Sequence, residues 1–160
     1  MTVPLAPPAL LEAAAEAAGP LEVEDPAKPW VVPPERIHSV LAALRDDPRL
    51  AMNSLMNLTA VDRPEQGQIE IVYHLCSLRH HHEVAVKTLC DRGSPHAPTA
   101  VDLWPAADWF EREVFDLFGV VFDGHPDLRR ILCPDDWVGH PLLRDYELPK
   151  DVHITTDRDD

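Results

Sequence analysis

The stretch from Trp104 to Asp145 constrains the fold of this chain more than any other, because an amphipathic helix there leads directly into a charged loop. The pattern predicts a helix with Pro105 in its first turn and Gly119 as its left-handed stop. Apolar residues at three- and four-residue spacing predict one buried face on this helix. They are Ala107, Phe110, Val114, Leu117 and Phe118.

The same helix carries more charge than an isolated helix needs. Asp108, Arg112 and Asp116 are four residues apart, so they predict a ladder of ion pairs on another face. Such pairs contribute only about 0.3–0.5 kcal/mol each on an exposed helix. The ladder therefore does not account for Glu111 and Glu113, which need partners elsewhere.

Arg129 and Arg130 are the expected partners of Glu111 and Glu113, because the short loop after Gly119 can fold back over the helix. An arginine binds a carboxylate through two hydrogen bonds, so such a cluster would hold the loop in one conformation. General acid–base carboxylates or a histidine metal site are the competing interpretations. The residues favour the structural one, since no nucleophile or cofactor loop adjoins the cluster.

Two Gly-His-Pro triplets follow the helix. Gly124-His125-Pro126 and Gly139-His140-Pro141 each place a permissive backbone position before a fixed one. They predict a pair of turns in the loop.

The run from Trp109 to Gly119, the segment from Phe122 to Leu132 and the motif Gly139-His140-Pro141-Leu142 closely resemble one protein family. It is the 30 kDa subunit family of the proton-pumping NADH:quinone oxidoreductase, respiratory complex I, whose members carry the letter C. The resemblance covers about a quarter of the chain almost without gaps. One departure is Leu143-Arg144-Asp145, where that family usually has Arg-Lys before the aspartate.

The resemblance implies a non-catalytic structural member of the peripheral arm, packed in a hetero-oligomer against the subunit that shapes the quinone site. FMN, iron–sulfur clusters and quinone would belong to partner subunits, and this chain would bind no cofactor. It would lie on the cytoplasmic side of the bacterial inner membrane, held there through its partners. The motif residues expected to have a structural or interface role are Trp109, Glu111, Arg112, Glu113, Asp116, Gly119, His125, Pro126, Asp127, Arg129, Arg130, Gly139 and Pro141.

Composition agrees with a folded, acidic protein. The chain has 160 residues, 45% of them apolar, which is enough for one domain with a core. Its 14 basic and 28 acidic residues leave a net charge of −14, which argues against nucleic acid and anionic membrane surfaces as partners. No run approaches the ~20 apolar residues that cross a bilayer, and no basic signal segment opens the chain.

The cysteines do not predict a metal centre. Cys76, Cys90 and Cys133 are widely spaced and odd in number, so reduced thiols are expected. An iron–sulfur cluster normally takes four thiolates, which the chain does not supply alone.

We expect three parts along the chain. Residues 1–28 are predicted to be an extension with a short helix over 9–18, which lies on another surface or frays because its apolar stripe is thin. Residues 29–145 form the domain that resembles the 30 kDa family. Residues 146–160 are a polar tail.

Within the domain, the patterns predict a strand over 30–32, a helix over 35–46 and a meander of strands near 55–61, 69–75 and 84–90. Residues 93–100 are expected to be a loop and 99–103 an extended segment. The fold class is therefore α/β of the α+β type, a two-layer domain with helices on a small mixed sheet.

Three neighbouring histidines, His80, His81 and His82, lie between two strands of the meander. Only His80 and His82 would point to the same face of a strand, so a metal site is the less favoured interpretation and a solvated or partner-facing strand end the favoured one.

Two functional alternatives remain open. One is the corresponding subunit of a membrane-bound hydrogenase or of another ferredoxin- or formate-linked complex. The other is a free-standing metal-dependent hydrolase that uses His125, His140 and nearby carboxylates.

Overall fold

The computed structural model describes residues 6–21 and 23–148. A four-stranded mixed sheet with the order β1-β4-β3-β2 forms its centre, and a small parallel pair, β5-β6, lies beside it. The described helices and strands are α1 (Pro7–Ala18), β1 (Trp30–Val31), α2 (Pro34–Asp46), β2 (Ser54–Arg63), the 3-10 turn Pro64–Gln66, β3 (Gln68–Cys76), β4 (Glu83–Asp91), β5 (His96–Pro98), α3 (Ala107–Phe118) and β6 (Val121–Asp123). The predicted α/β class with a mixed sheet is confirmed.

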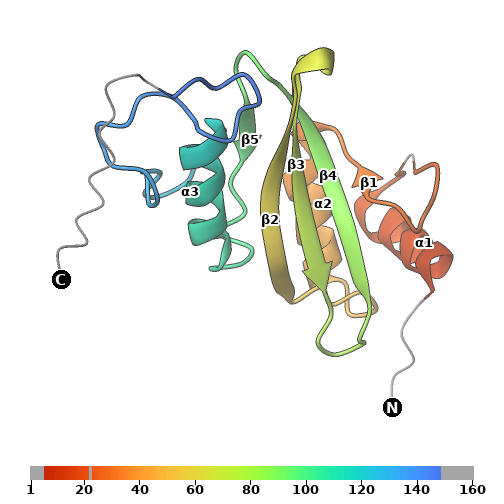
Figure 1. Ribbon diagram of the computed structural model, residues 1–160. Helices are drawn as coiled ribbons and strands as arrows, with labels where there is room; N and C mark the ends of the chain where they lie inside the picture. The colour runs from red at the N-terminus through yellow and green to blue at the C-terminus, as the bar shows by residue number, and fades with distance from the viewer. Residues whose placement is uncertain (1–5, 22, 149–160) are drawn as a thin grey trace, which may run out of the picture.

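The sheet has one buried face and one partly exposed face. Leu58, Tyr73 and Val86 lie side by side across β2, β3 and β4, and all three are buried. Because side chains alternate along a strand, this register puts the apolar residues of all three strands on one face. Helix α2 lies behind that face (Figure 1), with its predicted apolar stripe buried.

Helix α3 packs along β2, the strand at one edge of the sheet (Figure 1). It begins at Ala107, so Pro105 lies in the turn before it rather than in its first turn. It ends at Gly119, whose φ of +79° is the predicted left-handed stop. Ala107, Val114 and Phe118 are buried as expected, whereas Phe110 and Leu117 are only partly buried.

The connection before α3 differs from the sequence prediction. The sequence predicts a loop over residues 93–100, but His96–Pro98 forms β5. It predicts an extended segment over 99–103, but 101–103 form a turn. Strand β5 depends on pairing with β6, where Ala97 lies opposite Phe122, and such a long-range contact leaves no local periodicity in the sequence.

Helix α1 belongs to the same core as the sheet. Leu10 and Ala14 are buried, and the helix packs on α2. Glu16 of α1 also forms an ion pair with Arg49. The thin apolar stripe of this helix is therefore sufficient to hold it against the domain.

The three histidines close the turn between β3 and β4. His80 contacts the Pro48 carbonyl through Nε2 at 2.8 Å, and His82 contacts the Leu50 carbonyl through Nε2 at 2.7 Å. The two rings stack with their centroids 5.5 Å apart. These rings thus bind the turn to the segment after α2.

No helix in the described part of the chain is long and apolar enough to cross a membrane.

Candidate functional site

The candidate site is the C-terminal loop, residues 124–148, together with α3, over which the loop folds (Figure 1). Asp116, in the last turn of α3, anchors it. Its Oδ2 accepts hydrogen bonds from the backbone N–H groups of Ile131, Leu132 and Cys133 at 3.0, 2.7 and 2.9 Å. Its Oδ1 accepts a bond from Arg130 Nη1 at 2.7 Å. The loop therefore folds back over the helix, as expected.

Arg130 continues the anchor into the second half of the loop. Its Nη1 also donates to the Asp116 carbonyl at 3.1 Å, while Nη2 donates to the carbonyls of Trp137 and Gly139 at 3.2 and 3.0 Å. His140 Nδ1 donates to the same Asp116 carbonyl at 2.9 Å. One guanidinium thus fixes two parts of the loop to the end of one helix.

The donors around Asp116 keep it charged although it is fully buried. Burial alone would raise the pKa of this carboxyl, but the three N–H groups and Arg130 outweigh it and lower the pKa to about 2.

The predicted pairing of Glu111 and Glu113 with Arg129 and Arg130 is wrong. Arg130 binds Asp116, and Arg129 pairs with Asp127 at 2.9 Å on the surface. Glu113 is exposed. The physical reason is the rotation of α3, which turns Asp116 toward the loop and Glu111 toward the segment before the helix.

Glu111 has a different structural role. It is fully buried, and its carboxylate accepts hydrogen bonds from Thr99 Oγ1 and the Ala100 N–H, each at 2.6 Å. Burial raises the pKa of Glu111 to about 7, helped by the nearby charges of Asp102 and Asp108, while the two hydrogen bonds lower it. Glu111 therefore fixes the start of the β5–α3 connection.

The predicted ladder along α3 does not form either. Asp108 pairs with His125, with Oδ1 and Nε2 3.3 Å apart. Arg112 is buried, donates from Nε to the Arg129 carbonyl at 3.3 Å, and stacks 5.0 Å from the ring of Trp109. Each charged residue of the helix thus contacts the loop or a neighbouring ring rather than the next charge.

His125 and His140, the residues of the hydrolase alternative, bind backbone. His125 Nδ1 accepts the Asp127 N–H at 3.0 Å, and Nε2 donates to the Asp108 carbonyl at 3.3 Å. Both nitrogens of His125 are thus engaged, and the position of its ring does not fit a metal ligand. Across residues 6–21 and 23–148, no three His, Cys, Asp or Glu side chains gather in the manner of a metal site.

A second anchor was missed by the sequence analysis. Asp62, buried at the end of β2, accepts two bonds from Arg92 at 2.7 and 3.0 Å and one from the Arg144 N–H at 2.8 Å. It ties the loop to the sheet. The signal was available, because Asp62 follows Leu58 and Ala60 at inward positions of a strand, where a carboxylate needs a partner.

Two glycines allow the loop to approach closely. A Cβ on Gly119 would lie 2.7 Å from the His140 ring, and one on Gly139 would lie 2.8 Å from the Tyr146 ring. The glycines of both Gly-His-Pro triplets have positive φ, +85° at Gly124 and +83° at Gly139, which confirms the predicted turns. Pro126 is exposed and Pro141 half-buried beside them.

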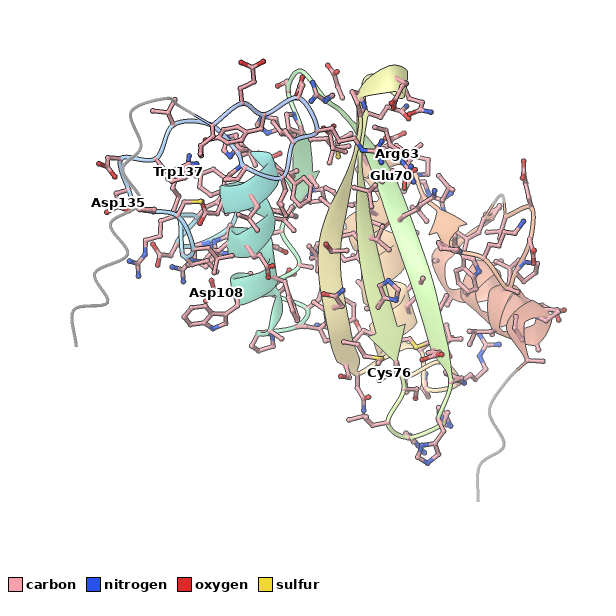
Figure 2. All side chains as sticks on the ribbon, viewed as in Figure 1. Arg63, Glu70, Cys76, Asp108, Asp135 and Trp137 are labelled. Atoms are coloured by element: carbon pink, nitrogen blue, oxygen red, sulfur yellow. The ribbon has the colours of Figure 1, made fainter. Side chains whose placement is uncertain are left out.

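The anchored loop presents an apolar surface with α3. Four side chains, which we call the loop surface, are more than half exposed: Trp109 at 62%, Leu132 at 61%, Val138 at 72% and Leu142 at 52%. Asp108, Asp135 and Trp137, labelled in Figure 2, show where this part of the molecule lies. A rigid loop with exposed apolar side chains is an arrangement for binding another protein rather than for chemistry.

Asp116→Asn is expected to lower the free energy of unfolding by about 3–5 kcal/mol, because it leaves Arg130 and three N–H groups without their acceptor. Asp127→Asn, which breaks an exposed pair, should cost only about 0–1 kcal/mol. Urea denaturation at pH 7 measures both. The folded pKa of Asp116 is depressed, so its stabilisation is present above about pH 4 and lost as the pH falls toward 2. Equal effects of the two variants would contradict the anchor.

Glu111→Gln is expected to change the pH dependence of stability. The pKa of Glu111 is raised by folding, so wild-type stability from this group is complete below about pH 4.5 and falls as the pH rises through 7. Relative to wild type, the variant should gain up to about 3 kcal/mol between pH 4.5 and 8. Glu113→Gln, exposed on the same helix, is the control and should show no such gain in denaturation series.

Gly119→Ala and Gly67→Ala form a matched pair. Both positions have positive φ, +79° and +64°, so each alanine costs about 1–2 kcal/mol. Only the Cβ at position 119 meets a side chain, whereas that at 67 finds nothing within 4 Å. Thermal unfolding should therefore show a larger loss of stability for Gly119→Ala, and equal losses would argue against the close packing of His140.

Comparison with known proteins agrees with this geometry. The model of the family described as "Respiratory-chain NADH dehydrogenase, 30 Kd subunit" matches residues 30–152. The NADH-quinone oxidoreductase protein that carries the subunit letter C in Moorella thermoacetica is 51% identical over 118 residues, 74% of this chain and 78% of that protein. Its counterpart in a Roseiflexus species is 45% identical over 130 residues, 80% and 75% of the two chains.

Two solved structures are also similar. A chain of the membrane-bound sulfane sulfur reductase, an archaeal respiratory membrane complex, is 30% identical with a TM-score of 0.65, over 81% of this chain and 77% of that one. The trypsin-resistant fragment of Nqo5 is 34% identical with a TM-score of 0.59, over 76% and 97%. With a family match that spans most of its length, the chain belongs to the family of the 30 kDa subunit of the respiratory-chain NADH dehydrogenase.

Proposed function

We propose that this chain is a non-catalytic subunit of the peripheral arm of proton-translocating NADH:quinone oxidoreductase, and that the loop surface packs against the subunit that shapes the quinone site. The complex transfers electrons from NADH through FMN and iron–sulfur centres to quinone. In this proposal those groups are bound by partner subunits. Family membership and the relatives from NADH-quinone oxidoreductase support the proposal.

The observation that carries the proposal is the exposed Trp109–Arg112 pair. The guanidinium of Arg112 stacks on the Trp109 ring, and its protein partner is a neutral carbonyl. Among the described residues, no carboxylate lies within ion-pair distance of Arg112. Tryptophan and arginine are the residues most enriched at the centres of protein interfaces. A partner surface with an acidic group beside an apolar pocket would complete this pair.

The anchors of the loop give the surface a second property that an interface needs. Asp116 and Asp62 fix the loop from both sides, so little conformational freedom is lost when a partner binds. A flexible segment of the same composition would have to order its backbone during association, at about 1–2 kcal/mol per residue. The anchored loop avoids this cost.

The proposed location is the cytoplasmic side of the bacterial inner membrane, reached through partner subunits. The net charge of −14 supports attachment through proteins, because an acidic chain is repelled by the anionic membrane surface.

A second candidate is the corresponding subunit of a related complex that does not take electrons from NADH. The similarity to a chain of an archaeal sulfane sulfur reductase favours it. The identity of the proteins that copurify with this chain in mild detergent discriminates between the two, since flavin-containing NADH-oxidising subunits accompany only the first.

Trp109→Asp is the direct test of the loop surface. Placing a charge at the centre of an interface should cost at least about 2 kcal/mol, so the assembled complex should fall more than about tenfold on a native gel. Leu78→Asp is the control, because Leu78 is similarly exposed, at 66%, in the β3–β4 turn. NADH:quinone turnover per assembled flavin should be unchanged in both. Normal abundance with turnover reduced about tenfold would show instead a direct role in quinone chemistry.

The purified chain alone is expected to oxidise no NADH and to show no absorbance in the visible region. Its three cysteines are one fewer than an iron–sulfur cluster normally takes. Spectra and iron analysis after anaerobic purification measure this. Stoichiometric iron with a visible chromophore would show that the chain carries a redox centre.

A further inference from the structure

We propose that the free edge of β4 beside Leu89 binds one extended, aliphatic segment of a partner protein of the complex, which adds to the sheet as a strand and places a carboxylate near Arg36. This inference rests on the proposed membership in a complex. It concerns a surface separate from the loop surface, because β1 and β4 lie at the opposite side of the sheet from β2 and α3 (Figure 1).

The two edges of the sheet are protected very differently. Strand β2 is covered by α3. On the other side, β1 pairs with β4 only at Trp30↔Val86 and Val31↔Lys87. One further bond joins the Val32 N–H to the Lys87 carbonyl at 2.8 Å. After that β1 ends, because the next two residues are Pro33 and Pro34, which have no N–H to donate.

Leu89 is the next residue of β4 that faces this edge. Backbone N–H and C=O groups alternate in direction along a strand, so Leu89 points the same way as Lys87, which pairs with β1. On this side the register with β1 stops at Lys87, and within residues 6–21 and 23–148 nothing bonds to the Leu89 backbone there. The edge thus offers one donor and one acceptor at the spacing of a parallel or antiparallel neighbour.

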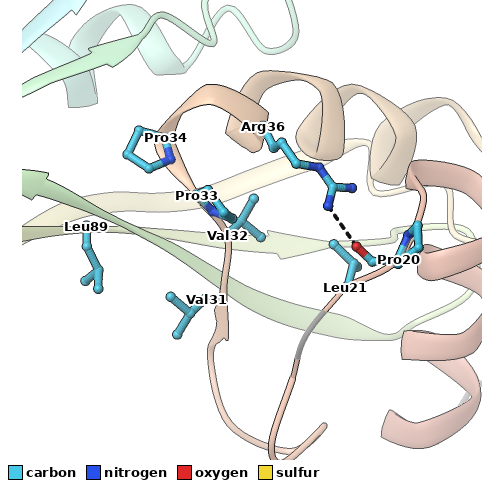
Figure 3. A pocket seen from close by; sticks show the side chains of 8 residues that line it. All are labelled: Pro20, Leu21, Val31, Val32, Pro33, Pro34, Arg36 and Leu89. Carbon is cyan, nitrogen blue, oxygen red and sulfur yellow. Dashed lines mark hydrogen bonds between the residues drawn. The ribbon is translucent and has the colours of Figure 1, made fainter.

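The surroundings of this edge are apolar. A groove of about 590 Å³ opens beside it, lined on the sheet side by Val31 and Leu89 and on the other side by Leu21, Val32 and the two prolines (Figure 3). Val31 is 43% exposed. A strand edge that only met water would not need aliphatic walls. Side chains such as valine, isoleucine or leucine on an added strand would fill them.

Arg36 is the one charged residue among those that line the groove. It donates from Nη1 to the Pro20 carbonyl at 2.8 Å (Figure 3) and from Nη2 to the Ala18 carbonyl at 2.9 Å. Both acceptors are neutral, and no ion pair of Arg36 is found within the described residues. On a chain with a net charge of −14, this cation selects a segment that carries an aspartate, a glutamate or a terminal carboxylate.

Hydrogen exchange on the purified complex and on the isolated chain tests the inference. The Leu89 amide should exchange rapidly in the isolated chain and at least about tenfold more slowly in the complex, since a partner strand would pair it. The Lys87 amide, which already pairs with β1, is the internal control and should be protected in both. Rapid exchange of Leu89 in the complex would overturn the proposal.

Leu89→Pro and Leu89→Ala separate the backbone donor from the side chain. Proline removes only an N–H that faces outward, which sheet edges tolerate, whereas alanine keeps it. In competition with the wild-type chain, Leu89→Pro should enter the complex about tenfold less well and Leu89→Ala within about threefold. Equal entry of Leu89→Pro would contradict strand addition. Thermal unfolding of the isolated variant checks that it folds; if it does not, the exchange measurement decides.

The outcomes also separate this inference from the proposed function. If the wild-type chain does not copurify with the complex, the proposed function fails. If it copurifies and the Leu89 amide stays unprotected, only the strand addition fails. If the isolated chain sediments as a dimer with a protected Leu89 amide, the occupant is a second copy of the chain rather than a partner, and the proposal is wrong.

Discussion

The structure around α3 depends on one buried carboxylate. Asp116 lies two residues before the end of the helix, where the helix dipole disfavours a negative charge. Four donors compensate for this position and for burial. In the same place, Arg130 and His140 donate to the Asp116 carbonyl, one of the groups that a helix end leaves without an internal partner. The requirements of the helix end and of the loop are thus met by the same contacts.

This arrangement explains how a long segment without helix or strand, residues 124–148, can form a defined surface. Its backbone groups find partners on α3 and, through Asp62, on β2. The sheet order places this surface at one edge and the β1–β4 groove at the other. A small domain with distinct surfaces at its two edges is suited to join two neighbours, which no single cofactor site would require.

Local features of the fold were predictable from the sequence. The alternation in β3 and β4, the stripe of α2 and the stop at Gly119 each depend on neighbours within a few residues. The partners of the charges were not predictable, because periodicity gives the spacing of side chains on a helix but not its rotation against the domain. Strands β5 and β6 were missed for a related reason, since their pairing joins segments far apart in the chain.

The same limit explains why two acidic residues of α3 differ so much. Glu111 and Asp116 are both fully buried, yet the pKa of the first is raised and that of the second is lowered. Glu111 has two neutral donors and lies near Asp102 and Asp108, whereas Asp116 has three N–H groups and a guanidinium. Because the loop is anchored by the carboxylate that stays charged, its conformation does not change as the pH varies around neutrality, and protonation of Glu111 acts on the opposite side of the helix.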